Sequence, residues 1–172
     1  MFGEGGRQLV CTYASAICEY YILQSKADNH AVREAACHCI SELCTKVAST
    51  IDKDPFKPHV TEMLAALLDC FKDESWPVRD CACLALGHFV ATFPEESQPV
   101  FAELCVLWFD HLSDNIQSIR ENTAHSLALV MGSEIHGQEI KQKVKEHVKE
   151  NLMKAKEQQS ESQKFAGLQN VT

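Results

Sequence analysis

An internal repeat constrains most strongly what this chain can fold into. Residues 58–89 align without a gap with residues 99–130 after a shift of 41 positions, which places Arg79 on Arg120. An earlier copy surrounds Arg33, which precedes Arg79 by 46 positions. Because a spacing in the low forties is typical of repeats that consist of a pair of helices, we expect helix pairs stacked in a row.

Each copy is predicted to contain two helices, because apolar residues such as Val60, Met63 and Leu67 recur at three- and four-residue steps. The first helices are expected at residues 7–25, 57–72 and 97–112, and the second helices at residues 30–49, 76–92 and 116–131. No segment shows the two-residue alternation of a β-strand. We therefore predict an all-α fold, an α-α superhelix of about three helix pairs plus a C-terminal helix, with repeats at residues 7–49, 57–92 and 97–131.

The segment after Gly132 differs from the repeats. Residues 134–158 are rich in Lys, Glu and Gln, with an apolar stripe at Ile140, Val144, Val148 and Leu152. We expect a polar helix that caps the open end of the stack. A coiled-coil partner helix and a weak nucleic-acid contact are the alternatives for this stripe. A disordered tail is predicted over residues 159–172.

The first predicted helix is apolar around most of its circumference, so one side is expected to face water. The residues concerned are Leu9, Val10, Tyr13, Ile17, Tyr20, Tyr21, Ile22 and Leu23. This pattern predicts either that the chain is a piece of a longer repeat protein or that it self-associates through its N-terminal helix.

Charge is distributed unevenly along the chain, whose formal net charge is -8. Residues 1–138 hold nine basic and nineteen acidic residues, whereas residues 139–172 hold seven and five. The acidic body disfavours binding to nucleic acid and favours a basic partner. No run of about 18 apolar residues and no secretory signal is present, which predicts a soluble protein, cytoplasmic or nuclear, without a membrane span.

The nine cysteines are predicted to be small buried residues in a reducing compartment. Cys37 and Cys39 are two residues apart, so on a helix their side chains diverge by about 200° and suit no metal site. The same holds for Cys81 and Cys83. A glycine-rich phosphate loop, a Gly-x-Ser-x-Gly elbow and a His-Glu-x-x-His helix are missing from the sequence. We therefore predict no catalytic, cofactor-binding or metal-binding residues and no enzyme activity.

Residues 73–87 resemble the HEAT-repeat pattern of a turn Asp, a Val-Arg pair, small residues and Ala-Leu-Gly. Weaker copies precede and follow this segment, so the resemblance covers about residues 10–131. The third copy departs from the pattern at Asn122 and Thr123, which replace small residues. The resemblance implies a HEAT-repeat (armadillo-like) solenoid whose turn Asp and helix Arg residues form a hydrogen-bonded ladder between repeats. The residues that match this structural ladder are Asp28, Arg33, Asp73, Arg79, Asp114 and Arg120.

The resemblance also implies that the second helices line the concave side, where HEAT proteins commonly hold a partner. The residue after each ladder Arg is acidic, and His or Leu follows four positions later. The hypothetical partner-binding residues are therefore Glu34, His38, Glu42, Asp80, Leu84, Glu121 and His125. They are interpreted as a groove for a basic or amphipathic protein segment. The alternative explanation is that acidic residues favour the first turn of any helix.

Together these features predict a non-catalytic protein–protein interaction scaffold or adaptor. One alternative is a fragment of a nuclear transport receptor of the importin-β type, which would bind basic cargo or a small GTPase in intracellular transport. Another alternative is an enzyme or an enzyme subunit, which stoichiometric bound metal would support.

Overall fold

The computed structural model describes residues 4–48 and 53–169, with side chains described for residues 5–48 and 53–159. Within these ranges the chain forms helices and no strand, as predicted. Its α-helices are α1 (Glu4–Thr12), α2 (Ala14–Gln24), α3 (His30–Leu43), α4 (Val60–Phe71), α5 (Trp76–Thr92), α6 (Gln98–His111), α7 (Gln117–Val130) and α8 (Gly137–Gln169). A π-helical turn, Cys44–Ala48, continues α3, and a 3-10 turn, Lys57–His59, leads into α4.

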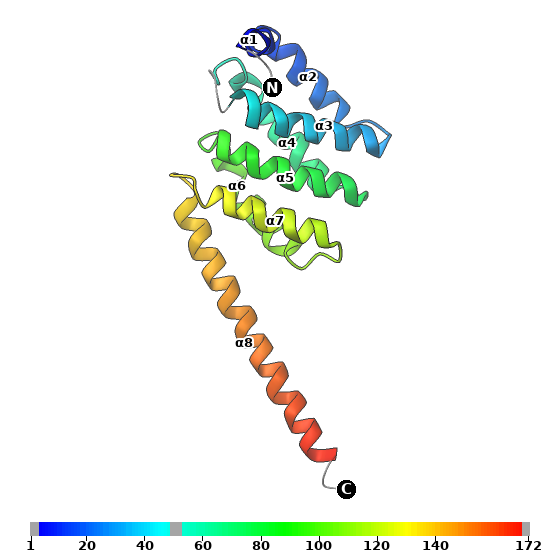
Figure 1. Ribbon diagram of the computed structural model, residues 1–172, viewed down its shortest axis with the longest axis vertical. Coiled ribbons are helices and arrows are strands. Elements are labelled where there is room, and N and C mark those ends of the chain that lie inside the picture. The colour runs from blue at the N-terminus through cyan, green and yellow to red at the C-terminus, as the bar shows by residue number, and fades with distance from the viewer. Residues whose placement is uncertain (1–3, 49–52, 170–172) are drawn as a thin grey trace.

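The helices are stacked in two layers. α3, α5 and α7 lie side by side in one layer, and α2, α4 and α6 lie in the layer behind it (Figure 1). The fold is therefore the all-α helical repeat solenoid that the internal repeat predicts. Side chains between the two layers form a continuous core, whose largest fully buried members include Phe56, Phe71, Phe89, Phe93 and Trp108.

The first predicted helix is divided into α1 and α2 at Tyr13. The hydroxyl of Thr12 donates to the carbonyl of Gln8 at 2.9 Å, a contact that competes with the helix ladder and bends helices. An exposed apolar surface remains on these two helices, formed by Leu9, Tyr13, Tyr20 and Leu23. Their other side packs against the core through Val10, Cys11, Tyr21 and Ile22.

A short polar side chain lies at or just before the start of each helix of the α3, α5 and α7 layer. Asn29 accepts a hydrogen bond from the Ala31 amide at 2.9 Å and caps α3. In the next two repeats, Asp73 accepts from the Ser75 amide and Asp114 accepts from the Ile116 amide, each at 2.8 Å. These turns orient the chain so that each helix of this layer starts at the equivalent place in its repeat.

Small and hydroxyl-bearing residues join α5 to α7. Ser126 donates to the carbonyl of Cys83 at 3.0 Å, and the Cys83 sulfur lies 3.3 Å from the Thr123 hydroxyl. Asn122 also donates to the Asp80 carboxylate at 3.0 Å. The departures from the repeat pattern at Asn122 and Thr123 therefore have a structural cause, since both side chains bond across the junction between repeats.

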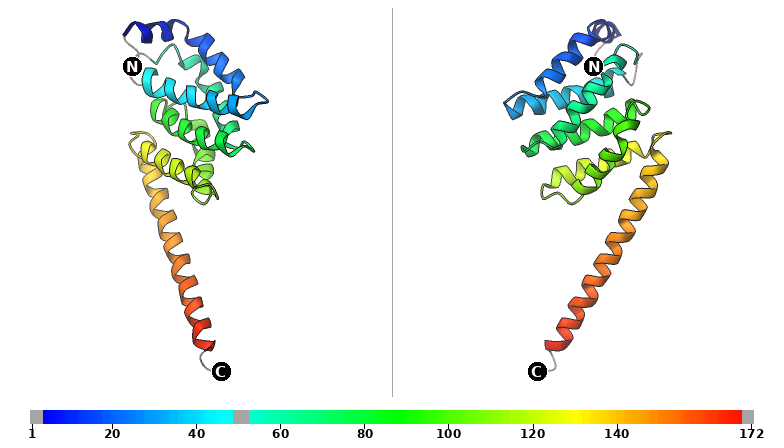
Figure 2. Two further views of the ribbon diagram at one scale, coloured as in Figure 1. Left: turned by 45° about the vertical axis from the view of Figure 1, so that its right-hand side comes forward. Right: turned by 180° about the vertical axis from the view of Figure 1, so that it is seen from behind.

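α8 leaves the stack as a long projecting helix, which corrects two expectations (Figure 1; Figure 2). It caps the core only through its first turns, where Ile140 is buried and Val144 partly buried, while Val148 and Leu152 are exposed. Its backbone is helical to Gln169, so the disorder predicted from residue 159 is wrong up to that point. Residues 159–166 contain no glycine or proline, and nothing in them interrupts a helix. Residues 170–172 lie outside the described part.

None of the helices in the described ranges has the length and apolar character that crossing a bilayer requires.

Substituting Gly87 tests the close approach of α5 and α7. A Cβ atom at Gly87 would lie 2.6 Å from the Ser126 hydroxyl and 2.8 Å from the Ser126 Cα, a backbone atom. Gly87→Ala is therefore expected to lower the free energy of unfolding by about 1–3 kcal/mol in chemical denaturation. The matched control is Gly5→Ala, whose Cβ would meet no atom within 4 Å and which gains helix propensity. A Gly87→Ala chain as stable as the wild type would contradict this packing.

Candidate partner-binding surface

The outer face of the α3, α5 and α7 layer carries the residues that the sequence nominated for partner binding. Glu34, Asp80 and Glu121 occupy equivalent positions on the three helices. The next equivalent row consists of His38, Leu84 and His125. His38, Glu121 and His125 are exposed, whereas Glu34, Asp80, Leu84 and Glu42 are partly buried. We call this surface the acidic face.

The structure brings two of these residues, Glu34 and His38, together beside the thiol of Cys81. A shallow hollow of about 450 Å³ between α3 and α5 is lined by Ala31, Glu34, Ala35, His38 and Cys81. Burial raises the pKa of Cys81 to about 12, and the negative charges of Glu34 and Asp80 contribute to that rise. The hollow is therefore a place of negative potential with small apolar walls.

The three acidic residues of the first row differ in how far they are engaged within the chain. The Asp80 carboxylate accepts a hydrogen bond from Asn122 across the junction of α5 and α7. Glu121 accepts a hydrogen bond from Gln117 at 2.7 Å, within α7 and at an exposed position. Asp80 therefore contributes to the repeat contact as well as to the face, and its replacement would change both.

A histidine that sequence reasoning missed completes the acidic face. His88 lies one helical turn beyond Leu84, and its ring centroid is 6.3 Å from that of His125. Burial and then the neighbouring His125 lower the pKa of His88. His88 follows Glu42 by the repeat offset of 46 residues, so it is the equivalent position on α5. Extending the row of Asp80 and Leu84 by one more helical turn would have identified it.

Glu42 and Lys46 form an ion pair within α3 and the turn that follows it. The hydrogen bond from Lys46 lowers the pKa of Glu42, and the nearby His38 and His88 act in the same direction. A second shallow hollow, of about 400 Å³, is lined by Thr45, Lys53, His88, Ala91 and Thr92. The acidic face is thus charged, polar and shallow rather than a deep pocket for a small molecule.

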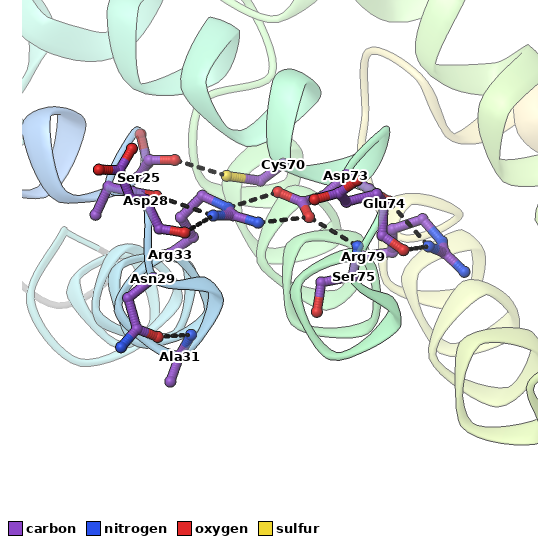
Figure 3. A network of polar contacts seen from close by, with 11 residues as sticks. Ser25, Asp28, Asn29, Ala31, Arg33, Cys70, Asp73, Glu74, Ser75 and Arg79 are labelled. Carbon is purple, nitrogen blue, oxygen red and sulfur yellow. Dashed lines mark hydrogen bonds and ion pairs between the residues drawn. The ribbon is translucent and has the colours of Figure 1, made fainter.

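One rung of the expected ladder joins the first two repeats (Figure 3). Arg33 donates Nε to Asp73 Oδ2 at 2.7 Å and an Nη to Asp73 Oδ1 at 2.9 Å. It also donates to the carbonyls of Ala27 and Asp28, each at 2.9 Å. The paired guanidinium lowers the pKa of Asp73 through these hydrogen bonds. A bidentate pair of this kind fixes both the distance and the orientation of the two repeats.

The ladder does not continue as expected. Arg79 donates to the carbonyls of Asp73 and Glu74 in its own turn, and Arg120 donates to the carbonyl of Asp114. In the described ranges no ion pair joins Arg79 to Asp114. Asp28 takes part through its carbonyl and not its carboxylate. The second junction relies instead on the contacts of Asn122, Thr123 and Ser126 with α5.

All nine cysteines are free thiols, and the six that are buried all lie in the main core. Burial raises the pKa of Cys18 to about 11 and that of Cys44 and Cys83 to about 12. Among the described residues, no group of three or more His, Cys, Asp and Glu side chains is arranged to hold a metal ion. Thiols with a raised pKa are poor nucleophiles, so these cysteines serve packing.

Comparison with known proteins identifies one family. A family model described as HEAT repeat matches residues 63–93, which cover most of α4 and all of α5. No curated protein and no solved structure matches the chain.

Arg33→Ala is expected to lower the melting temperature more than Arg120→Ala, because Arg33 bridges two repeats whereas Arg120 donates to a carbonyl of its own turn. The hydrogen bonds from Arg33 lower the pKa of Asp73 in the folded chain. The pair therefore stabilises the folded state fully above the ordinary carboxyl pKa of about 4, and this stabilisation is lost as the pH falls through the pKa of the folded state. The difference in melting temperature between the wild type and Arg33→Ala should therefore become smaller at acidic pH. Calorimetry between pH 7 and pH 3 measures these melting temperatures. If their difference does not depend on pH, the Arg33–Asp73 pair is not its cause.

Alkylation tests the burial of the thiols. In the native chain, iodoacetamide at pH 7.5 should leave Cys18, Cys44 and Cys83 unmodified, because they are buried and the thiolate is the reactive form. In urea all nine cysteines should be modified. Peptide mapping by mass spectrometry gives both results, and rapid labelling of the three in the native chain would show that the core is open.

Proposed function

We propose that this chain, whose residues 63–93 match the HEAT-repeat model, is a non-catalytic scaffold that binds a basic, amphipathic segment of another protein. Helical repeats of this class often mediate protein interactions. The segment would lie across α3, α5 and α7 on the acidic face. Repetition favours such binding, since equivalent side chains recur at each helix and can contact successive turns of an extended or helical ligand.

The observation that carries the proposal is the alignment of carboxylates on one face. Glu34, Asp80 and Glu121 stand at equivalent positions, and Lys46 on the same face is paired with Glu42. Neighbouring helices pack about 8–10 Å apart, so the row presents negative charge at nearly regular intervals. Complementary charge of this kind speeds association and sets orientation, while small apolar contacts supply the remaining affinity.

The chemistry of the face supports binding in preference to catalysis. The thiol of Cys81 has a pKa of about 12, so it is protonated at neutral pH and is a poor nucleophile. Both hollows on the face are shallow, and a reaction centre usually needs a site that excludes water. We therefore assign Glu34, His38 and Glu121 to partner contact and to no chemical step.

Charge reversal on the acidic face is the direct test. Glu34→Lys combined with Glu121→Lys should weaken binding of a synthetic helical Lys/Leu peptide by about tenfold, because each change replaces an attraction by a repulsion. Fluorescence anisotropy with the labelled peptide at low salt measures the effect. Asp80 is left unchanged because it also bonds Asn122.

The matched control carries the same charge change on the other layer. Glu62 and Asp69 are exposed on α4, so Glu62→Lys combined with Asp69→Lys alters the net charge equally without touching the acidic face. Binding should stay close to the wild-type value in this control. If both double variants lose affinity equally, net charge explains the effect and the acidic face does not. If Glu34→Lys with Glu121→Lys binds as tightly as the wild type, the acidic face is not the binding surface.

A further inference from the structure

The far half of α8 packs against no other helix in the described part of the chain. α8 has 33 residues, so it is about 50 Å long, and its first turns pack on the stack. Its last described ring contact places His147 5.1 Å from Phe109 on α6. Beyond that contact, Val148, Leu152 and Met153 are exposed by 50%, 57% and 54%. Figure 2 shows this part of α8 directed away from both layers.

The exposed part of α8 is itself a basic amphipathic segment. At 100° per residue, Val148, Leu152 and Ala155 fall on one side of the helix. Lysines line one flank of that apolar side, at Lys145, Lys149 and Lys156. The glutamates fall on the opposite side, at Glu146, Glu150 and Glu157. This arrangement presents apolar and positive groups together and keeps negative groups away from them.

The acidic face has the complementary chemistry and a matching scale. Glu34 and Glu121 lie two helix spacings apart, about 16–20 Å, and Lys145 and Lys156, eleven residues apart, are separated by about 17 Å along α8. Between the carboxylates lie small apolar side chains, Ala31 and Ala35, which line the hollow beside Glu34. A helix with apolar residues beside a row of lysines would place each group against its counterpart.

Pairing of two α8 helices with each other is disfavoured. An antiparallel pair that sets Val148 against Leu152 of the second copy would also bring Lys149 near the same residue of that copy, and these like charges would lie at the centre of the contact. The acidic face of a second copy offers carboxylates in their place. Within one copy, α8 leaves the stack at its α7 end and runs away from α3 and α5 (Figure 1).

We propose that α8 of one copy, through residues 145–156, docks on the acidic face of a second copy. The proposal rests on the binding function argued above and names its ligand. Two copies can exchange their α8 helices reciprocally, which occupies both surfaces. Unequal docking would instead join copies head to tail and form larger assemblies.

A charge-swap experiment on the full chain tests the docking. Sedimentation velocity at low salt should show concentration-dependent self-association of the wild type. Lys145→Glu combined with Lys156→Glu should weaken it by at least about tenfold, and so should Glu34→Lys combined with Glu121→Lys. All four changes in one chain should restore association, because the two charge patterns are exchanged. A wild type that stays monomeric at every concentration, or a four-fold variant that stays as weak as its parents, would overturn the proposal.

A matched control and a peptide measurement separate this inference from the function on which it rests. Lys143→Glu combined with Lys154→Glu changes the charge of α8 equally on its other flank, and self-association should persist. The Lys145→Glu, Lys156→Glu chain is then titrated with a peptide of residues 141–159 and with the synthetic Lys/Leu peptide. Binding of both supports the docking. Binding of the Lys/Leu peptide alone overturns the docking and keeps the proposed function, and binding of neither overturns both.

Discussion

The close contact between successive helices of the α3, α5 and α7 layer is the constraint on which the rest of the structure depends. At Gly87 the backbone of α5 leaves no room for a Cβ beside Ser126 of α7. Such proximity fixes the helix spacing, and the spacing fixes where equivalent side chains lie on the outer face. The row of carboxylates is therefore a consequence of packing: stacking copies of one unit repeats its surface chemistry as well as its core.

The two junctions between repeats solve the same packing problem with different chemistry. The first uses a bidentate ion pair between Arg33 and Asp73, and the second uses hydroxyl and amide bonds from Asn122 and Ser126. At the second junction the Ser126 hydroxyl donates to the carbonyl of Cys83, a backbone acceptor that a small hydroxyl side chain can satisfy at a close contact between helices. The two junctions therefore keep the same stacking of helices, while both the positions and the chemistry of their polar contacts differ.

Much of this architecture could be predicted because helical periodicity and a repeat offset are properties of the sequence itself. The paired helices and the stripe through Glu34, His38 and Glu42 follow from those two periods. The rest depended on tertiary contacts. The local geometry of its turn decides which acceptors Arg79 bonds. The point where α8 leaves the stack depends on how far along α8 the contact with α6 continues. His88 was missed because the stripe was read one turn too short in the second repeat.

The unequal offsets between copies, 46 residues and then 41, show where this architecture tolerates change. Arg33 still meets Asp73 across the first junction, so the five additional residues, which fall between Lys46 and Val60, leave the helix register intact. The entropy of closing a loop grows only slowly with its length. A duplicated unit can thus lengthen at its connections while its binding surface is conserved, and the same connection offers a site where an epitope or a fluorescent reporter could be inserted.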